Sequence, residues 1–380
     1  MNTIYFDNSA TTKPHKEVID EVVDCLENYY ANPSAAYKIG IEAEKKVKVA
    51  RENVAKLICA MPSEIVFTSG GSESNNAAIK GIVKSGDHVI ISSFEHKSMI
   101  QTVNELESEG VEVTLLPINS SGIVDIGVLE SGIKSNTKLV SIMHVNNEIG
   151  AIQPIKEISK IVRSKSKKAR IHVDAVQSLG KIKIDVNDMG IDMLSISSHK
   201  IHGPKGVGAL YIKKNMVLKP LISGGGQEMD RRSGTENVPG ISGFGVACKL
   251  AISDFEEKSN IVKSIKERFI EGLHDIDDII INSPVDKNHI HNILSVSFGG
   301  IRGEVLLHSL EDYNIFVSTG SACSAKKSSD KNYVLPSIGL NDKYIKGTIR
   351  FSFSYTNTLG EVDNTIDIIK KVLPFLRRIK

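Results

Sequence analysis

The chain has 380 residues, which is enough for one large domain and a smaller second domain. Its 41% hydrophobic and 24% charged residues exclude a disordered chain, a collagen-like fibre and a small disulfide-rich scaffold. Lys and Arg number 47 and Asp and Glu number 45, so the net charge of +2 offers no basic surface for direct nucleic-acid binding. No apolar run approaches the roughly 18–20 residues of a membrane span, and the first residues lack the features of a secretory signal.

Between residue 64 and about residue 211, short β-rich runs alternate with longer helical stretches. The predicted strands cover residues 65–67, 89–92, 111–116, 139–145 and 171–174, and the predicted helices cover residues 75–83, 98–108 and 155–162. Strands that alternate with helices predict crossover units and a parallel sheet buried on both faces. We therefore expect an α/β fold in this part of the chain.

Polar residues gather where the predicted strands end. In a parallel α/β sheet, ligands bind at the carboxyl ends of the strands. Polar groups occur at just these positions, in residues 69–72, 95–96, 146–148, 174–177 and 197–200. The sequence therefore predicts one functional site along this edge of the sheet.

After about Asp254 the pattern changes to that of a smaller α+β domain. A long charged helix reaches about His274, and further elements are predicted at residues 293–298, 305–310 and 315–317. Residues 349–355 alternate apolar and polar side chains, which predicts a strand with one solvated face. The last helix has one apolar stripe, made of Val362, Ile366, Ile369, Leu373 and Leu376. We expect a large domain of residues 15–254 and a small domain of residues 1–14 and 255–380.

The predicted edge carries a glycine-rich segment and three side chains with possible catalytic roles. Residues 69–76 could cradle an anion at a helix N-terminus, although an ordinary strand–helix turn uses the same residues. Lys200 could be desolvated and form a Schiff base, but most lysines are solvated surface residues. Asp174 could pair with a protonated pyridine nitrogen or cap the next helix. His96 could stack on a flat ring, take part in proton transfer, or be an ordinary loop histidine.

The cysteines and one arginine differ in their surroundings. Three cysteines lie among apolar neighbours in helix-like stretches and are expected to pack in the core: Cys25, Cys59 and Cys248. Cys323 lies instead in a Gly/Ser-rich loop followed by lysines, where a thiolate would have access to a substrate. Arg350 could bind a carboxylate or form a surface salt bridge. Because the cysteines show no paired spacing, they indicate a reduced protein of the cytoplasm without a metal site.

Ten short motifs follow one another in a fixed order from one end of the chain to the other. They lie at residues 5–12, 32–34, 67–76, 95–97, 144–150, 173–178, 198–206, 232–237, 320–323 and 349–352. On these motifs the chain resembles the cysteine desulfurases of the NifS/IscS type, which are class V relatives of the aminotransferases that use pyridoxal phosphate. The resemblance implies a fold-type I transferase, in which a large cofactor-binding domain has a mainly parallel seven-stranded sheet. The small α+β domain is then expected to carry the loop with the catalytic cysteine.

The resemblance also implies how pyridoxal phosphate would be bound. Lys200 would hold the cofactor covalently and later move protons, Asp174 would pair with the pyridinium nitrogen, and His96 would stack on the ring. The phenolic oxygen of the cofactor would bind Gln177 and Asn147. The cofactor phosphate would be bound by Gly71, Ser72, Ser197 and His199, and by Thr235 from the other subunit of a homodimer.

For the substrate, the resemblance implies L-cysteine as the source of sulfur. Arg350 would bind the carboxylate of L-cysteine together with Asn32 and Asn147. Cys323 would attack the substrate sulfur and become a persulfide, with release of L-alanine. The sulfur would then pass to an acceptor protein, such as an iron–sulfur scaffold or a thiolation enzyme.

The sequence departs from the family at three places. Tyr37 replaces a usual histidine, Met229-Asp230 replaces a usual Arg-Gly pair, and residues 325–332 are rich in lysine. We expect altered substrate handling at Tyr37 and an altered subunit contact at Met229-Asp230. The lysine-rich stretch leaves the identity of the sulfur acceptor open, but not the transfer of sulfur. Two alternatives remain open at this point. One is a selenocysteine lyase or another class V lyase that uses pyridoxal phosphate, and the other is a sulfur-carrier scaffold that is slow without its partner.

Overall fold

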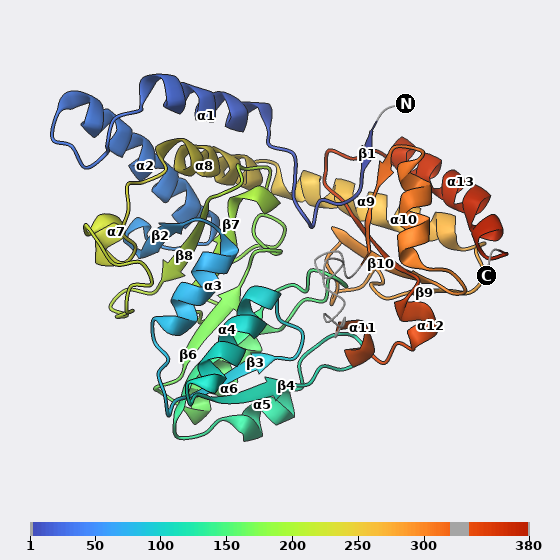
Figure 1. Ribbon diagram of the computed structural model, residues 1–380, viewed down its shortest axis with the longest axis horizontal. Helices are drawn as coiled ribbons and strands as arrows, with labels where there is room; N and C mark the ends of the chain where they lie inside the picture. The colour runs from blue at the N-terminus through green and yellow to red at the C-terminus, as the bar shows by residue number, and fades with distance from the viewer. Residues whose placement is uncertain (1–2, 320–333, 379–380) are drawn as a thin grey trace.

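The large domain is built on a sheet of seven strands in the order β2-β8-β7-β6-β5-β3-β4 (Figure 1). The computed structural model describes residues 3–319 and 334–378. The strands are β2 (Ile65–Thr68), β8 (Gly208–Ile212), β7 (Met193–Ser197), β6 (Arg170–Asp174), β5 (Thr137–Met143), β3 (His88–Ser92) and β4 (Glu112–Leu116). The neighbours of β8 pair with it antiparallel, and all other pairs are parallel. The prediction of a mainly parallel sheet in an α/β fold is confirmed.

Helices cover both faces of this sheet. The helices of the large domain are α1 (Lys16–Asn28), α2 (Lys38–Leu57), α3 (Gly71–Lys80), α4 (Lys97–Ser108), α5 (Ile126–Gly132), α6 (Ile155–Lys165), α7 (Gln227–Asp230) and α8 (Val238–Ile252). Successive side chains of β3 point to opposite faces, so Val89 and Ile91 join one buried cluster while Ile90 joins the other. The near-continuous apolar runs seen in the sequence follow from this burial on two sides.

The small domain has its own core and a four-stranded antiparallel sheet. Its sheet has the order β12-β13-β10-β9, with β9 (Ile279–Ile281), β10 (Ile293–Phe298), β12 (Ser318–Thr319) and β13 (Thr348–Ser352). The helices are α9 (Phe255–Leu273), α10 (Gly303–Glu311), α11 (Val334–Ser337), α12 (Asp342–Ile345) and α13 (Leu359–Leu376). The predicted apolar stripe of α13 is confirmed, because its members pack into a buried cluster that is separate from those of the large sheet.

The N-terminal segment crosses from one domain to the other. Strand β1 (Ile4–Tyr5) pairs in parallel with β11 (Ile315–Phe316), and Phe6 belongs to the small-domain core. The cluster that contains Ile4 and Phe6 otherwise draws on residues 262–373, in keeping with the predicted division of the chain. The boundaries at residues 14 and 254 stay a prediction.

Two expectations from the sequence are wrong. All five residues of β13 are buried, because the N-terminal segment covers the polar face that was expected to be solvated. Thus Ser352 Oγ accepts a hydrogen bond from Ser9 N at 2.9 Å. Cys59 is exposed rather than in the core, because the chain turns there with a φ of 56°, just after α2. Cys25 and Cys248 are buried as expected.

No helix in residues 3–319 and 334–378 combines the length and the apolar character needed to cross a bilayer.

Candidate functional site

The carboxyl ends of five strands meet at one edge of the large sheet, as predicted. β2, β3, β5, β6 and β7 all run in the same direction, since only β8 is reversed. The polar segments that follow these strands therefore lie along the same edge. This edge faces the small domain and the N-terminal segment that links the two domains (Figure 1).

Lys200 ends a short 3-10 turn, Ser198–Lys200, directly after β7. Its Nζ donates hydrogen bonds to two backbone carbonyls of the N-terminal segment, Ser9 O at 2.6 Å and Ala10 O at 2.7 Å. The same segment is held in place by Thr12, whose N and Oγ1 both donate to His199 O. The lysine is thus a positioned amine and not a solvated surface residue.

Asp174 is the last residue of β6 and is only 4% exposed. Its Oδ2 accepts from Asn75 Nδ2 at 2.8 Å and its Oδ1 from Val176 N at 3.0 Å. Both donors are neutral, and no residue of the described ranges forms an ion pair with Asp174. A buried carboxylate without a cationic partner is costly, so this position suits a ligand that brings a protonated nitrogen.

His96 is the N-cap residue of α4. Its Nδ1 accepts a hydrogen bond from Ser98 N at 3.2 Å, so the ring proton of the neutral form is on Nε2. Burial lowers the pKa of His96, the nearby Asp174 opposes this, and Lys200 and Lys97 add to the lowering. A neutral, partly buried imidazole beside a carboxylate suits contact with a flat ring.

Gln177 is fixed by two hydrogen bonds that settle the orientation of its amide. Its Nε2 donates to Ser9 O at 2.9 Å, and its Oε1 accepts from Lys181 Nζ at 3.3 Å. The amide N–H₂ therefore faces the N-terminal segment that also holds Lys200. Asn147 lies after β5 and uses its backbone carbonyl to accept from Arg350.

The expected anion cradle lies between β2, the start of α3 and the end of β7. Gly70 has a φ of 153°, and a Cβ on Gly71 would lie 2.6 Å from Val176 Cγ2, so neither position accommodates a side chain without change. Ser197 is buried, whereas Ser72 is exposed in the first turn of α3. Backbone N–H groups at such a helix N-terminus favour a phosphate.

His199 lies at the same end of β7 and bonds Thr11 Oγ1 through Nδ1 at 3.2 Å. Burial, with the nearby Lys200, Lys205 and Lys181, lowers the pKa of His199 to about 4. The ring is therefore neutral near pH 7 and can serve as a hydrogen-bonding group.

Arg350 comes from β13 of the small domain and is 6% exposed. Its Nη2 donates to Asp7 Oδ1 at 2.9 Å and its Nη1 to Asn147 O at 2.8 Å. Its buried Nε has no hydrogen-bond partner among the residues that the structure describes. An oriented guanidinium with an unused buried donor suits the recognition of a carboxylate.

One predicted residue, Asn32, is not brought to this edge within one chain. Asn32 is exposed in the connection between α1 and α2, where its Oδ1 accepts from Ser34 N, and this connection lies at the outer end of the large domain (Figure 1). Thr235 is exposed between α7 and α8. Cys323 and the lysine-rich residues 325–332 lie outside the described residues.

Two of the departures from the family fall on exposed positions. Tyr37 is 58% exposed at the N-cap of α2, and Met229 is 46% exposed. Glu228, Met229 and Asp230 have φ values of 49°, 61° and 62°, so three successive residues other than glycine are left-handed. Such backbone persists only where its surroundings hold it in place.

Four further residues support the site and were not assigned roles from the sequence. Asn75 orients Asp174 and Asp7 orients Arg350, and both lie inside motifs that the sequence singled out. Glu95 is buried, and burial raises its pKa to about 8. Lys181 reaches Gln177 from four positions along the chain, a spacing that could have indicated the contact.

The family described as aminotransferase class-V matches residues 4–365 of the chain. A protein named cysteine desulfurase IscS, from Clostridium botulinum, is 43% identical over 97% of the chain and 94% of its own length. Its namesake from Methanosarcina thermophila is 42% identical over 99% of the chain and 93% of its own length.

Solved structures of similar proteins carry related names. One described as a NifS-like protein has a TM-score of 0.93 and 39% identity, and the match covers 99% of this chain and 100% of that one. Another, described as SspA in complex with cysteine, has a TM-score of 0.81 and 39% identity, with 94% of this chain and 100% of that chain covered.

Proposed function

Since the chain belongs to the class V aminotransferase family, we propose that it is a cysteine desulfurase, which takes sulfur from L-cysteine and releases L-alanine. The proposal rests above all on one observation: Lys200, Asp174 and Arg350 lie at the same edge of the sheet. Backbone carbonyls accept from the Lys200 amine, an amide donates to Asp174, and Asp7 orients Arg350. The relatives named cysteine desulfurase and the neighbour described with cysteine support the same reaction.

The side chains at this edge fit pyridoxal phosphate. Lys200 would hold it through the amine, the buried carboxylate of Asp174 would bind the pyridine nitrogen, and His96 would lie against the ring. Gln177 and Asn147 would bind the phenolic oxygen, and the phosphate would be bound by Gly71, Ser72, Ser197 and His199. When bound, this cofactor supplies an electron sink for the carbon atoms of the substrate.

The chain's own residues would then position the substrate and move protons. Arg350 would bind the carboxylate of L-cysteine through its unused Nε, while Asp7 and Asn147 O keep the guanidinium in place. The amine of Lys200, when free, would donate to the carbonyls of Ser9 and Ala10. These carbonyls favour the protonated amine, so Lys200 would serve as an acid. Its proton would go to the carbon that loses sulfur.

The sulfur itself would go to Cys323. Its thiolate would attack the substrate sulfur, so an S–S bond forms while the C–S bond breaks. One thiol and L-cysteine thereby give one persulfide and L-alanine, with no other oxidant or reductant needed. The persulfide would then be passed to an acceptor protein, such as an iron–sulfur scaffold or a thiolation enzyme, in the cytoplasm.

The working enzyme would be a homodimer. The exposed apolar side chains of Ile19, Val23 and Leu26 on α1, and of Tyr30 just after it, would be covered by the partner subunit. Asn32 is exposed at the outer end of the large domain and Thr235 is exposed as well, so a partner subunit could use both as the sequence predicts. Helix α7, which contains the left-handed Met229, also lies at the outer end of the large domain (Figure 1).

The test is the release of alanine from L-cysteine by the cofactor-loaded protein, for the wild type and Cys323→Ala together. We expect alanine from the wild type only, with a mass increase of one sulfur atom on the peptide that contains Cys323. Equal alanine release by Cys323→Ala would refute the role of this thiol. Activity with selenocysteine but not with cysteine would instead indicate a selenocysteine lyase.

A further inference from the structure

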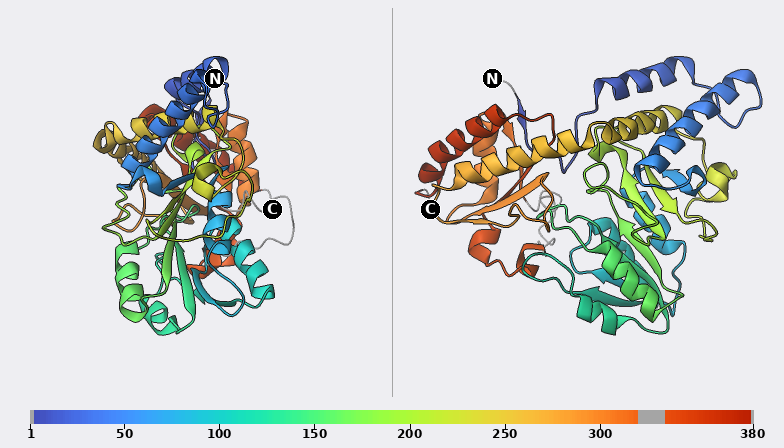
Figure 2. Two further views of the ribbon diagram at one scale, coloured as in Figure 1. Left: turned by 90° about the vertical axis from the view of Figure 1, so that its left-hand side faces the viewer. Right: turned by 180° about the vertical axis from the view of Figure 1, so that it is seen from behind.

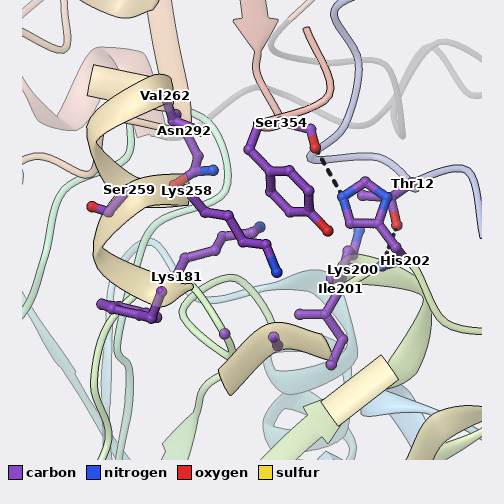
Figure 3. A pocket seen from close by; sticks show the side chains of 14 residues that line it. Thr12, Lys181, Lys200, Ile201, His202, Lys258, Ser259, Val262, Asn292 and Ser354 are labelled. Atoms are coloured by element: carbon purple, nitrogen blue, oxygen red, sulfur yellow. Dashed lines mark hydrogen bonds between the residues drawn. The ribbon is translucent and has the colours of Figure 1, made fainter. Parts of the chain in front are cut away.

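A second pocket lies behind Lys200, where the two domains meet (Figure 3). Its walls come from the N-terminal segment at Thr12, the turn at Gly180 and Lys181, the start of α9, and the small domain at Asn292 and Tyr355. Helices α8 and α9 lie almost end to end beside it and connect the domains (Figure 2). Lys200 lines this pocket, whereas Asp174 and His96 do not, so the pocket is distinct from the positions expected to bind the cofactor ring.

The pocket is cationic. Lys181 and Lys258 both point into it, and Lys200 lines one wall (Figure 3). None of the residues that line the pocket, all from the described part of the chain, is acidic. The charged groups that act on Lys181 are themselves cations, namely Lys200 and Arg350. Positive charge therefore accumulates around Lys181, and Glu17, the carboxylate that acts on Tyr355, is not among the groups that act on Lys181.

Lys181 can donate further hydrogen bonds. Its ammonium group has three N–H donors, and within residues 3–319 and 334–378 its only acceptor is Gln177 Oε1, at 3.3 Å. Burial, with Lys200 and Arg350, lowers the pKa of Lys181 to about 7. An anion in the pocket would accept the remaining N–H groups and keep the lysine protonated.

Lys258 supplies a fixed second charge. Its Nζ donates to Leu250 O at 2.6 Å and to Ser253 O at 2.9 Å, and it lies 4.8 Å from the centre of the Tyr355 ring. These contacts hold the ammonium group at the end of α8, where it adds positive potential. Because it is already anchored, it attracts an anion without having to be ordered first.

We infer that this pocket is a binding site for a small oxyanion, a phosphate or carboxylate group, held by Lys181 and attracted by Lys258. The cavity has a volume of about 60 Å³, which suits a small ion and not a macromolecule. A bound anion would draw the ammonium of Lys181 away from Gln177 Oε1, and so would act on an amide that faces the candidate active site.

The first experiment uses the cofactor-loaded wild type and inorganic sulfate, whose charge is constant near neutral pH. Acetic anhydride labels accessible neutral amines, and peptide mass spectrometry reads Lys181 and the exposed Lys183 separately. With sodium chloride keeping the ionic strength constant, sulfate at about ten times its dissociation constant should slow the labelling of Lys181 about tenfold. The labelling of Lys183 should not change. Equal rates at Lys181 with and without sulfate would overturn the inference.

The second experiment compares Lys181→Met with Lys183→Met by thermal unfolding during a sulfate titration. Excluded sulfate stabilises all proteins to a similar degree, so only a saturable increase in Tm reports a site. We expect that increase in the wild type and in Lys183→Met and its loss in Lys181→Met. Curves for Lys181→Met that match the wild type would contradict the assignment. Repeating the labelling with phosphate and with acetate shows which oxyanion the pocket prefers, and neither readout depends on desulfurase activity.

Discussion

The ion pair between Arg51 and Glu228 offers a quantitative test of how the turn before Thr235 is held. Glu228 accepts two hydrogen bonds from Arg51, both at 2.7 Å, and one from Phe67 N at 2.8 Å. The Glu228 side chain is 3% exposed and that of Arg51 is 16% exposed. Glu228→Gln keeps the size of the side chain but leaves Arg51 without a counter-charge.

Removal of one partner from a buried ion pair lowers the unfolding free energy by about 3–5 kcal/mol. Because Arg51 is partly exposed, we expect a loss of about 3 kcal/mol for this pair. Urea unfolding followed by circular dichroism should therefore show a clear fall in the unfolding free energy for Glu228→Gln. The matched control is Glu256→Gln, whose ion pair with Lys183 has side chains that are 72% and 75% exposed and should change little.

A third variant separates loss of charge balance from loss of packing. Arg51→Met combined with Glu228→Gln removes the stranded guanidinium, so it should recover much of the lost stability. The reasoning would be refuted if Glu228→Gln were no less stable than Glu256→Gln. It would also be refuted if the double variant had a lower unfolding free energy than Glu228→Gln alone.

Two further changes address the site. Arg350→Lys removes the planar donor fork, so kcat/KM for alanine release should fall about 10- to 100-fold, mainly through KM, and a change below about threefold would argue against carboxylate binding there. For Glu95, the folded pKa of about 8 exceeds the usual 4.5, so between these values the folded state retains a proton that the unfolded state loses. Stability should fall as pH rises through that window, and urea midpoints at about pH 5 and about pH 8 should differ less in Glu95→Gln than in the wild type.

Much of the large domain could be predicted because its signals are local. Each strand is a short apolar run, each helix has its own period, and the polar residues follow directly after the strands. This is why Lys200, Asp174 and His96 were expected at one edge before any distance was known.

The features that sequence reasoning missed depend on contacts between distant segments. The polar face of β13 looks solvated in the sequence, but Ser9 and Asp7 cover it from the other end of the chain. Lys181 is four residues from Gln177, yet its cationic surroundings come from the start of α9 and from β13. Local periodicity carries no information on such neighbours.

The N-terminal segment has a consequence for how the protein is made. The backbone N–H of Ser9 donates to the side chain of Ser352, 343 residues later in the chain, and the carbonyl of Ser9 accepts a hydrogen bond from the amine of Lys200. During synthesis, the large sheet can assemble while β13 is still inside the ribosome, but the first dozen residues cannot complete their contacts until nearly the whole polypeptide has emerged. Closing so long a loop is slow, and the beginning of the chain stays exposed to proteases and chaperones until then. A bulky group fused close to Ile4 would therefore be expected to delay the last step of folding more than the first.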